Sequence, residues 1–132
     1  MPFTISWYMP DRIIYVELSG TVTAADVQAF IAQMYDMVAS SKLPVHSITD
    51  THRVVKIESI PAVFKTAQAA PMHQNAGWSI MVGSINPFVN FAADFVSSIM
   101  HSRYRRFDTM QQALDFVQER DETLTDVPLR QL

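Results

Sequence analysis

Cysteine is absent from this chain of 132 residues, and glycine occurs at only three positions, Gly20, Gly77 and Gly83. Without cysteine the chain has no disulfide, no thiolate nucleophile and no zinc site built on cysteine ligands. Three scattered glycines form neither a glycine-rich phosphate loop nor a dinucleotide-binding fingerprint. The Gly-x-Ser-x-Gly elbow of a nucleophilic serine is also missing. These absences exclude several common classes of enzyme.

An excess of basic charge and long apolar runs are missing as well. The formal net charge is −3, which gives no general attraction to nucleic acid or to an anionic membrane. No window approaches the roughly 18 to 20 apolar residues that span a bilayer, and residues 1–8 lack the pattern of a signal peptide. We therefore expect a cytoplasmic protein with no nucleic-acid partner and no membrane insertion.

What is present is the composition of one globular domain. Hydrophobic residues make up 48% of the chain, with eight Phe and eight Met, and this length can bury one sizeable core. Strands are expected over residues 3–9, 13–18, 45–49, 78–82 and 105–107. Helices are expected to begin after the capping residues Thr23, Ser59, Asn86 and Thr109.

This order of elements, ββαβαβαβα, predicts a single α/β domain. The turn at residues 9–12 makes the first two strands an antiparallel hairpin, and each later crossover adds a parallel strand. We expect a mixed sheet of about five strands with four helices. We assign residues 1–120 to the domain and residues 121–132 to a flexible tail, because the tail is polar and lacks periodicity.

His46, Asp50 and His52 form the sharpest polar combination in the chain. If residues 45–52 were extended, these three side chains would share one face, within reach of a divalent metal. Their spacing matches no known metal signature, so the alternative is a set of ordinary strand-end and loop residues. Paired carboxylates such as Glu119 with Asp121 or Glu122 lie near the tail, where we expect them to be solvated. The sequence therefore predicts neither an enzyme nor a cofactor.

Ser59, which follows Glu58 and precedes Pro61, allows two roles. Serine is a favoured N-cap, because its hydroxyl accepts a hydrogen bond from a free N–H group of the first turn. The same position would stabilise a phosphate, since those N–H groups and the helix dipole favour negative charge. Capping is the more common role, and phosphorylation of Ser59 remains the alternative.

Two candidate interaction surfaces lie in the second half of the chain. One is a broad apolar stripe on the third predicted helix, suited either to the core or to self-association and ligand binding; it comprises Phe88, Phe91, Phe95 and Ile99. The other is a basic group, either an anion-binding site or a solvated strand edge; it comprises Arg103, Arg105 and Arg106. The apolar surface favours a homodimer.

Three segments resemble the SpoIIAA-like or STAS-like family, small domains related to bacterial anti-sigma factor antagonists. They are residues 20–26 (Gly-Thr-Val-Thr-Ala-Ala-Asp), residues 80–83 (Ile-Met-Val-Gly), and residues 104–107 (Tyr-Arg-Arg-Phe) before a helix that includes Ala113 and Leu114. In element order the likeness extends over residues 1–120. It implies a non-enzymatic regulatory or protein-interaction module with a protein partner.

Signalling members of that family carry an Asp-Ser pair followed by Gly at the start of the second helix, and a partner kinase phosphorylates the serine. The similar segment here reads Glu58-Ser59 without the glycine. The resemblance thus points to Ser59 and Glu58 as the partner-facing site and phosphorylation candidate. The fold also resembles the lipid-carrying SEC14-type domains, which implies a small apolar ligand as the alternative.

Overall fold

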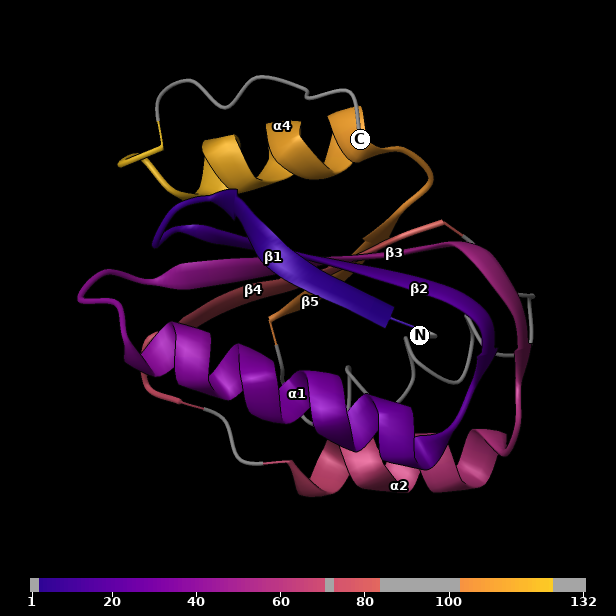
Figure 1. Cartoon of the computed structure of the whole chain (residues 1–132). Coiled ribbons are helices and arrows are strands. Elements are labelled where there is room, and N and C mark those ends of the chain that lie inside the picture. The colour runs from indigo at the N-terminus through magenta and orange to yellow at the C-terminus, as the bar shows by residue number, and fades with distance from the viewer. Residues whose placement is uncertain (1–2, 71–72, 84–102, 125–132) are drawn as a thin grey trace.

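The computed structural model describes residues 3–70, 73–83 and 103–124, and it contains one five-stranded sheet (Figure 1). The sheet begins with the hairpin of β1 (Phe3–Met9) and β2 (Ile13–Val22), which are antiparallel from the pair Phe3 and Leu18 to the pair Met9 and Ile13. The Arg12 N–H closes the turn on the Met9 carbonyl at 3.0 Å. The predicted hairpin is confirmed.

Three parallel strands extend the sheet from β2. They are β3 (Val45–Ile57), β4 (Ala76–Val82) and β5 (Tyr104–Phe107), and the spatial order is β1-β2-β3-β4-β5. The predicted mixed α/β sheet is confirmed. Two strands are longer than predicted: β2 has 10 residues, whereas the sequence predicts a strand over residues 13–18, and β3 has 13 residues, whereas the sequence predicts a strand over residues 45–49 only.

The described helices are α1 (Ala24–Ala39), α2 (Ile60–Ala69) and α4 (Met110–Arg120), and each begins at its predicted N-cap. Thr23 and Thr109 form capping boxes with Asp26 and Gln112, so two free N–H groups are satisfied at each of these ends. The helix predicted after Asn86, with its apolar stripe, lies outside the described residues. None of the described helices is both long and apolar enough to cross a membrane.

The helices lie on both faces of the sheet: α1 and α2 cover one face, and α4 covers the other (Figure 1). The sheet is therefore packed on two sides. The buried residues on the α1 side are Phe3, Ile14, Val16, Leu18, Val22, Val27, Phe30, Val38 and Val45. Those on the α4 side are Tyr8, Ile13, Tyr15, Ile48, Ile80, Val82, Ala113, Leu114, Val117 and Leu124. Leu124 belongs to the segment that we expected to be a flexible tail, and its side chain is buried in this core.

The second half of β3 extends beyond β4. Its register with β4 ends where Asp50 meets Val82, whereas its register with β2 continues to Ile57. Two register shifts against β2 each place one extra residue in β3, and such bulges re-aim side chains and increase the local twist. The second bulge contains Val55, whose surface is 82% exposed. This extension carries the chain directly to Ser59.

Candidate functional site

Ser59 is an exposed residue at the N-terminus of α2. Its backbone is extended (φ −144°, ψ 105°), and its hydroxyl accepts a hydrogen bond from the Ala62 N–H at 3.4 Å. The Ser59 carbonyl accepts the first helical hydrogen bond, from the Val63 N–H at 3.0 Å. The hydroxyl therefore lies over the N-terminal end of the helix dipole, where a negative group would be stabilised.

Ser59 follows exposed residues at the end of β3 and just after it. Lys56 and Glu58 are exposed, and the N–H of Glu58 donates to the Val22 carbonyl at 3.0 Å, so the backbone before Ser59 is held by β2. Val55 is the most exposed large apolar side chain among the described residues. We call Val55, Glu58 and Ser59 the Ser59 surface. It combines a fixed backbone, an apolar side chain in water and a hydroxyl at a helix end.

A second polar cluster lies where β4 and β5 end. The Tyr15 hydroxyl donates to Asp50 Oδ2 at 2.9 Å, and Asp50 Oδ1 accepts from the His52 backbone N–H at 2.9 Å and contacts His52 Nδ1 at 2.8 Å. His52 Nε2 lies 3.2 Å from the Asp108 carbonyl. Burial, followed by the hydrogen bond and negative charge of Asp50, raises the pKa of Tyr15. The cluster fastens the first bulge of β3 to the loop between β5 and α4.

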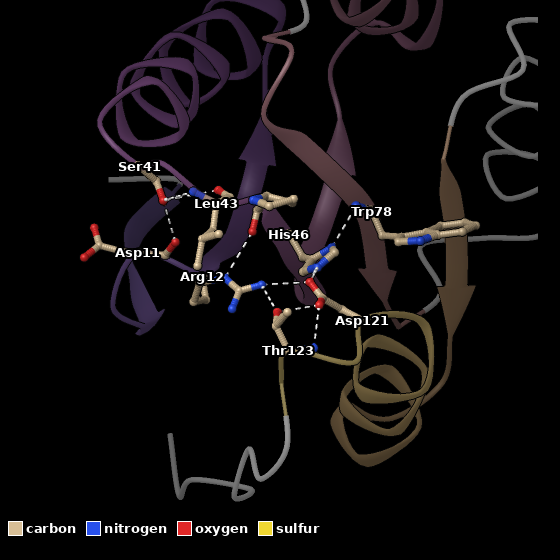
Figure 2. A network of polar contacts seen from close by, with 9 residues as sticks. Asp11, Arg12, Ser41, Leu43, His46, Trp78, Asp121 and Thr123 are labelled. Carbon is tan, nitrogen blue, oxygen red and sulfur yellow. Dashed lines mark hydrogen bonds and ion pairs between the residues drawn. The ribbon is translucent and has the colours of Figure 1, made fainter.

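His46 belongs to a different network, which Figure 2 shows. Its side chain is 4% exposed and lies 2.8 Å from Asp121 Oδ2 through Nε2. Arg12 Nη2 donates to the same carboxylate oxygen at 2.8 Å and to the Thr123 hydroxyl at 2.7 Å. These contacts join the hairpin turn, the start of β3 and the end of α4.

The structure thus does not bring His46, Asp50 and His52 together as the metal hypothesis requires. His46 is bonded to Asp121, whereas Asp50 and His52 are bonded to each other. Within residues 3–70, 73–83 and 103–124, no three His, Asp or Glu side chains are placed to hold a metal ion. His46 and Asp50 lie four residues apart in the regular part of β3, and a strand rises roughly 3.3 Å per residue, so the two side chains are too far apart along the strand to share one metal ion.

The hydrogen bonds of His46 fix its tautomer. Its Nδ1 accepts from the Trp78 backbone N–H at 2.9 Å, so the ring proton lies on Nε2 and is donated to Asp121. Burial lowers the pKa of His46 below its ordinary value of 6.5, and the charges of Arg12 and Arg103 act in the same direction. The bond to Asp121 opposes this shift without reversing it. His46 is therefore held neutral.

Asp121 is the acceptor at the centre of the network. Burial acts to raise its pKa, but hydrogen bonds from Thr123 and His46 and the charge of Arg12 outweigh burial and lower the pKa to about 2. Its side chain is only 13% exposed. The expectation that Asp121 is a solvated tail residue is therefore wrong, because Arg12 and His46 hold it against the sheet. Residues 125–132 lie outside the described residues.

We predict that acid destabilises the fold through His46. Because its pKa is lowered on folding, the unfolded chain binds more protons than the folded protein once the pH falls below about 6.5. The stabilisation that depends on a neutral His46 is fully present above about pH 6.5, and it is lost as the pH falls from there through the lowered pKa of His46. Urea unfolding between about pH 7.5 and pH 5 should show a falling free energy of unfolding.

The His46→Gln variant is the control for this prediction. It should show a smaller fall over the same pH range, because the titrating ring is gone. NMR titration of the His46 ring in the wild-type protein measures the pKa directly. A ring that titrates above 6.5 would contradict the prediction.

The three arginines do not form one patch. Arg105 lies over the rings of Trp78 and Phe116, at 5.5 and 5.9 Å from their centroids, on the α4 side of the sheet. Arg106 is the next residue of β5 and points to the opposite side. Arg103 precedes the strand, is exposed, and its carbonyl accepts the Ser79 N–H at 2.7 Å. The predicted anion-binding group is thus divided between two faces. The stripe formed by Phe88, Phe91, Phe95 and Ile99 lies outside the described residues.

Comparisons with known proteins bear on the fold. No protein-family model matches the chain, and no curated protein matches its sequence. Among solved structures, the anti-sigma factor antagonist SpoIIAA in its unphosphorylated form matches with a TM-score of 0.61 and 13% identity, covering 88% of this chain and 97% of SpoIIAA. The match thus covers most of both chains and includes the sheet. The fold of this chain is SpoIIAA-like.

Two further structures share the SpoIIAA-like fold. A DUF3478-family protein from Shewanella loihica matches with a TM-score of 0.60 and 16% identity, covering 86% of this chain and 90% of that protein. SpoIIAA, a Bacillus cell fate determinant, also matches in its phosphorylated form, with a TM-score of 0.58 and 15% identity, covering 87% of this chain and 98% of SpoIIAA. The resemblance drawn from the sequence is confirmed for the fold.

Within this SpoIIAA-like fold, the sequence pointed to Ser59 and Glu58 but missed Val55 and Asp121. Val55 belongs to residues 50–58, where polar and apolar residues follow no regular period, so neither a strand nor a bulge is predicted there. Asp121 lies past the last helical period, and its partners are distant in sequence. Of these residues, only Ser59 has a local sequence pattern that predicts its position, namely a capping residue shortly before Pro61.

Proposed function

We propose that this chain is a regulatory module that binds a protein partner through the Ser59 surface and catalyses no reaction. The observation that carries the proposal is the position of Ser59. It is exposed at the N-terminus of α2, at the end of an extended strand, in a fold shared with SpoIIAA. SpoIIAA is an anti-sigma factor antagonist with an unphosphorylated and a phosphorylated form.

The chemistry of the Ser59 surface supports this proposal. An aliphatic side chain as exposed as Val55 gains about 1.5 kcal/mol or more when a partner covers it. Phosphorylation of Ser59 would add negative charge at a helix N-terminus, where the free N–H groups stabilise it. The same charge would change the surface that a partner meets, next to Glu58. A partner is thus able to distinguish the two forms.

Two histidines of the described residues, His46 and His52, support a role without catalysis. His46 uses both ring nitrogens within the fold, one toward Asp121 and one toward the Trp78 N–H. Both ring nitrogens of His52 face oxygen atoms, of Asp50 and Asp108. A general base that activates a hydroxyl needs a ring nitrogen directed at that hydroxyl.

A small apolar ligand is the second candidate. The feature in its favour is a mostly apolar groove of about 560 Å³ between α1 and α2. A homodimeric state and a cytoplasmic location remain part of the proposal, as the sequence predicted them.

The first test of the proposed function places a photo-crosslinking amino acid on the Ser59 surface. At Val55, or at Ser59 itself, it should capture one protein of defined mass in cells of the source organism. The matched control at Gln111, an exposed position on α4, should not capture that protein. The same band at Gln111, or no band at either position of the Ser59 surface, would contradict the proposal.

Substitutions of Ser59 separate partner binding from stability. Ser59→Ala removes the N-cap and should lower the free energy of unfolding by about 1 kcal/mol. Ser59→Asp keeps a capping oxygen but adds charge, so it should preserve stability while changing the affinity for the captured partner by tenfold or more, on the order of 1.4 kcal/mol. Calorimetric titration with that partner measures the change. Equal affinities for the two variants and the wild type would show that Ser59 only caps α2.

A further inference from the structure

Strand β1 forms one edge of the sheet (Figure 1). In the described part of the chain it pairs with β2 alone, so alternate backbone N–H and C=O groups of β1 point away from the sheet. The strand has seven residues, Phe3–Met9, and none of them is charged. A long uncharged edge of this kind is a template on which a further strand can pair.

The opposite end of the sheet differs from β1. Strand β5 has only four residues, and two of them, Arg105 and Arg106, are charged. Short length and charged side chains are common ways in which proteins protect an edge strand from pairing with another chain. Strand β1 has neither form of protection, so its edge is suited to pairing.

The sequence of β1 is complementary to itself. Antiparallel pairing centred on Ser6, the middle residue, aligns the whole strand with the same strand of a second copy. Ile5 then lies opposite Trp7 of the partner subunit, and the same pair forms a second time. A β-branched residue opposite an aromatic residue is a favourable cross-strand pair. Ile5 and Trp7 are half-buried against the α1-side core, so this pairing continues that apolar layer into the second copy.

Helix α1 packs on β1, where the ring centroids of Phe3 and Phe30 are 5.8 Å apart. Pairing of two β1 strands therefore brings two α1 helices onto the same face of the joined sheet, one on each side of the two-fold axis. Helix α4 exposes charged residues such as Asp115, Glu119 and Arg120. The exposed residues of α1 outside its groove with α2 are all uncharged, and they are Ala25, Ala29, Gln33 and Ala39. Small uncharged side chains let two helices approach closely.

We propose that two copies of this chain pair β1 with β1 across a two-fold axis at Ser6, so that their two sheets become one continuous sheet. The contact is isologous and uses the β1 edge of both copies, so pairing ends at the dimer. It gives the homodimer of the proposed function its interface. Strand β2 separates β1 from the end of β3, so the Ser59 surface stays accessible in both copies. Self-association and partner binding are therefore separate properties, and each can fail without the other.

The first test places charges at the two-fold axis. Ser6 is exposed, so Ser6→Lys and Ser6→Glu should keep the fold, but each puts two like charges directly opposite each other in the dimer. Each variant alone should have a dimer Kd raised by about tenfold or more. An equimolar mixture of the two should form a dimer with a Kd near the wild-type value, because an acid then faces a base. Analytical ultracentrifugation measures every sample, and circular dichroism checks the fold.

The second test measures the register with Ser6→Cys. The wild-type chain has no cysteine, so this variant carries a single thiol. Pairing centred on Ser6 places the two Cα atoms at this position roughly 4.5 to 5.5 Å apart, which a disulfide can bridge. Mild oxidation should therefore give a covalent dimer. Gln111→Cys, at an exposed position of α4, should stay monomeric on a denaturing gel under the same conditions.

Gln111→Lys and Gln111→Glu are the matched controls for charge, and they should leave the dimer Kd unchanged. A wild-type protein that sediments as a monomer over the whole concentration range would overturn the proposal and would leave the β1 edge to a strand of another protein. A dimer that tolerates both charges at Ser6 would place the interface elsewhere and would also overturn it. The same holds if the mixture stays monomeric although both variants are folded, or if the controls weaken the dimer as much as Ser6→Lys.

Discussion

Replacing Asp121 with alanine is expected to lower the free energy of unfolding by about 3 to 5 kcal/mol. The Asp121 carboxylate interacts with Arg12 and His46, each at 2.8 Å. The side chain of Arg12 is only 10% exposed, so the substitution leaves a buried guanidinium without its counter-ion. Removing one partner of a buried ion pair destabilises a protein by more than the intact pair stabilises it, because the remaining charge stays buried without water or a counter-ion.

Urea denaturation followed by circular dichroism measures this loss. Glu122→Ala is the control, since it removes a carboxylate from the neighbouring exposed position and should change the free energy of unfolding by less than about 0.5 kcal/mol. Asp121→Asn keeps one acceptor oxygen, so its loss in free energy of unfolding should lie between the losses for Asp121→Ala and Glu122→Ala. A loss below about 1 kcal/mol for Asp121→Ala would mean that the network is solvated in solution.

The network gives the end of α4 a structural role. Asp121 and Leu124 follow that helix, and together they contribute a charged contact and a buried side chain to the α4 side of the core. Thr123 adds a hydrogen bond from Arg12 at 2.7 Å. These residues hold α4 on the sheet at the edge opposite the Asp50–His52 cluster, which fastens the loop before α4. Helix α4 is thus fixed at both ends.

Much of the fold was predictable because its signals are local. The Thr23 hydroxyl accepts a hydrogen bond from the Asp26 N–H three residues on, and Thr109 stands in the same relation to Gln112. Such caps are readable in a short window of sequence. The turn closed by Arg12 and Met9 is equally local. These features fixed the order of strands and helices, and the SpoIIAA-like topology follows from that order through right-handed crossovers.

The contacts of the site depend on distant residues, so the sequence did not predict them. Asp121 is separated by 109 residues from Arg12 and by 75 from His46, and no local pattern connects them. The second half of β3 pairs only with β2 among the described strands, so it lacks the apolar alternation of a buried strand. The position of Val55 follows from a bulge in that segment. The sequence predicted Ser59 because an N-cap is a local signal, whereas it did not predict the position of Val55 near it in the chain.

Gly77→Ala is expected to destabilise the protein by about 2 to 3 kcal/mol, although alanine suits a strand at least as well as glycine. A Cβ atom at Gly77 would lie 2.5 Å from Nδ1 and 2.7 Å from Cε1 of His46. The imidazole cannot turn aside without losing its bonds to the Trp78 N–H and to Asp121. The absence of a side chain at Gly77 therefore leaves room for the His46 ring to lie against the backbone of β4.

A double-mutant cycle separates this contact from a general effect on β4. His46→Ala removes the ring that the new methyl group would meet, so Gly77→Ala should cost less than about 0.5 kcal/mol in that background. The expected coupling energy is then about 1.5 kcal/mol or more, measured by urea denaturation of the four proteins. Equal costs of Gly77→Ala in the two backgrounds would show that the loss arises in the strand itself.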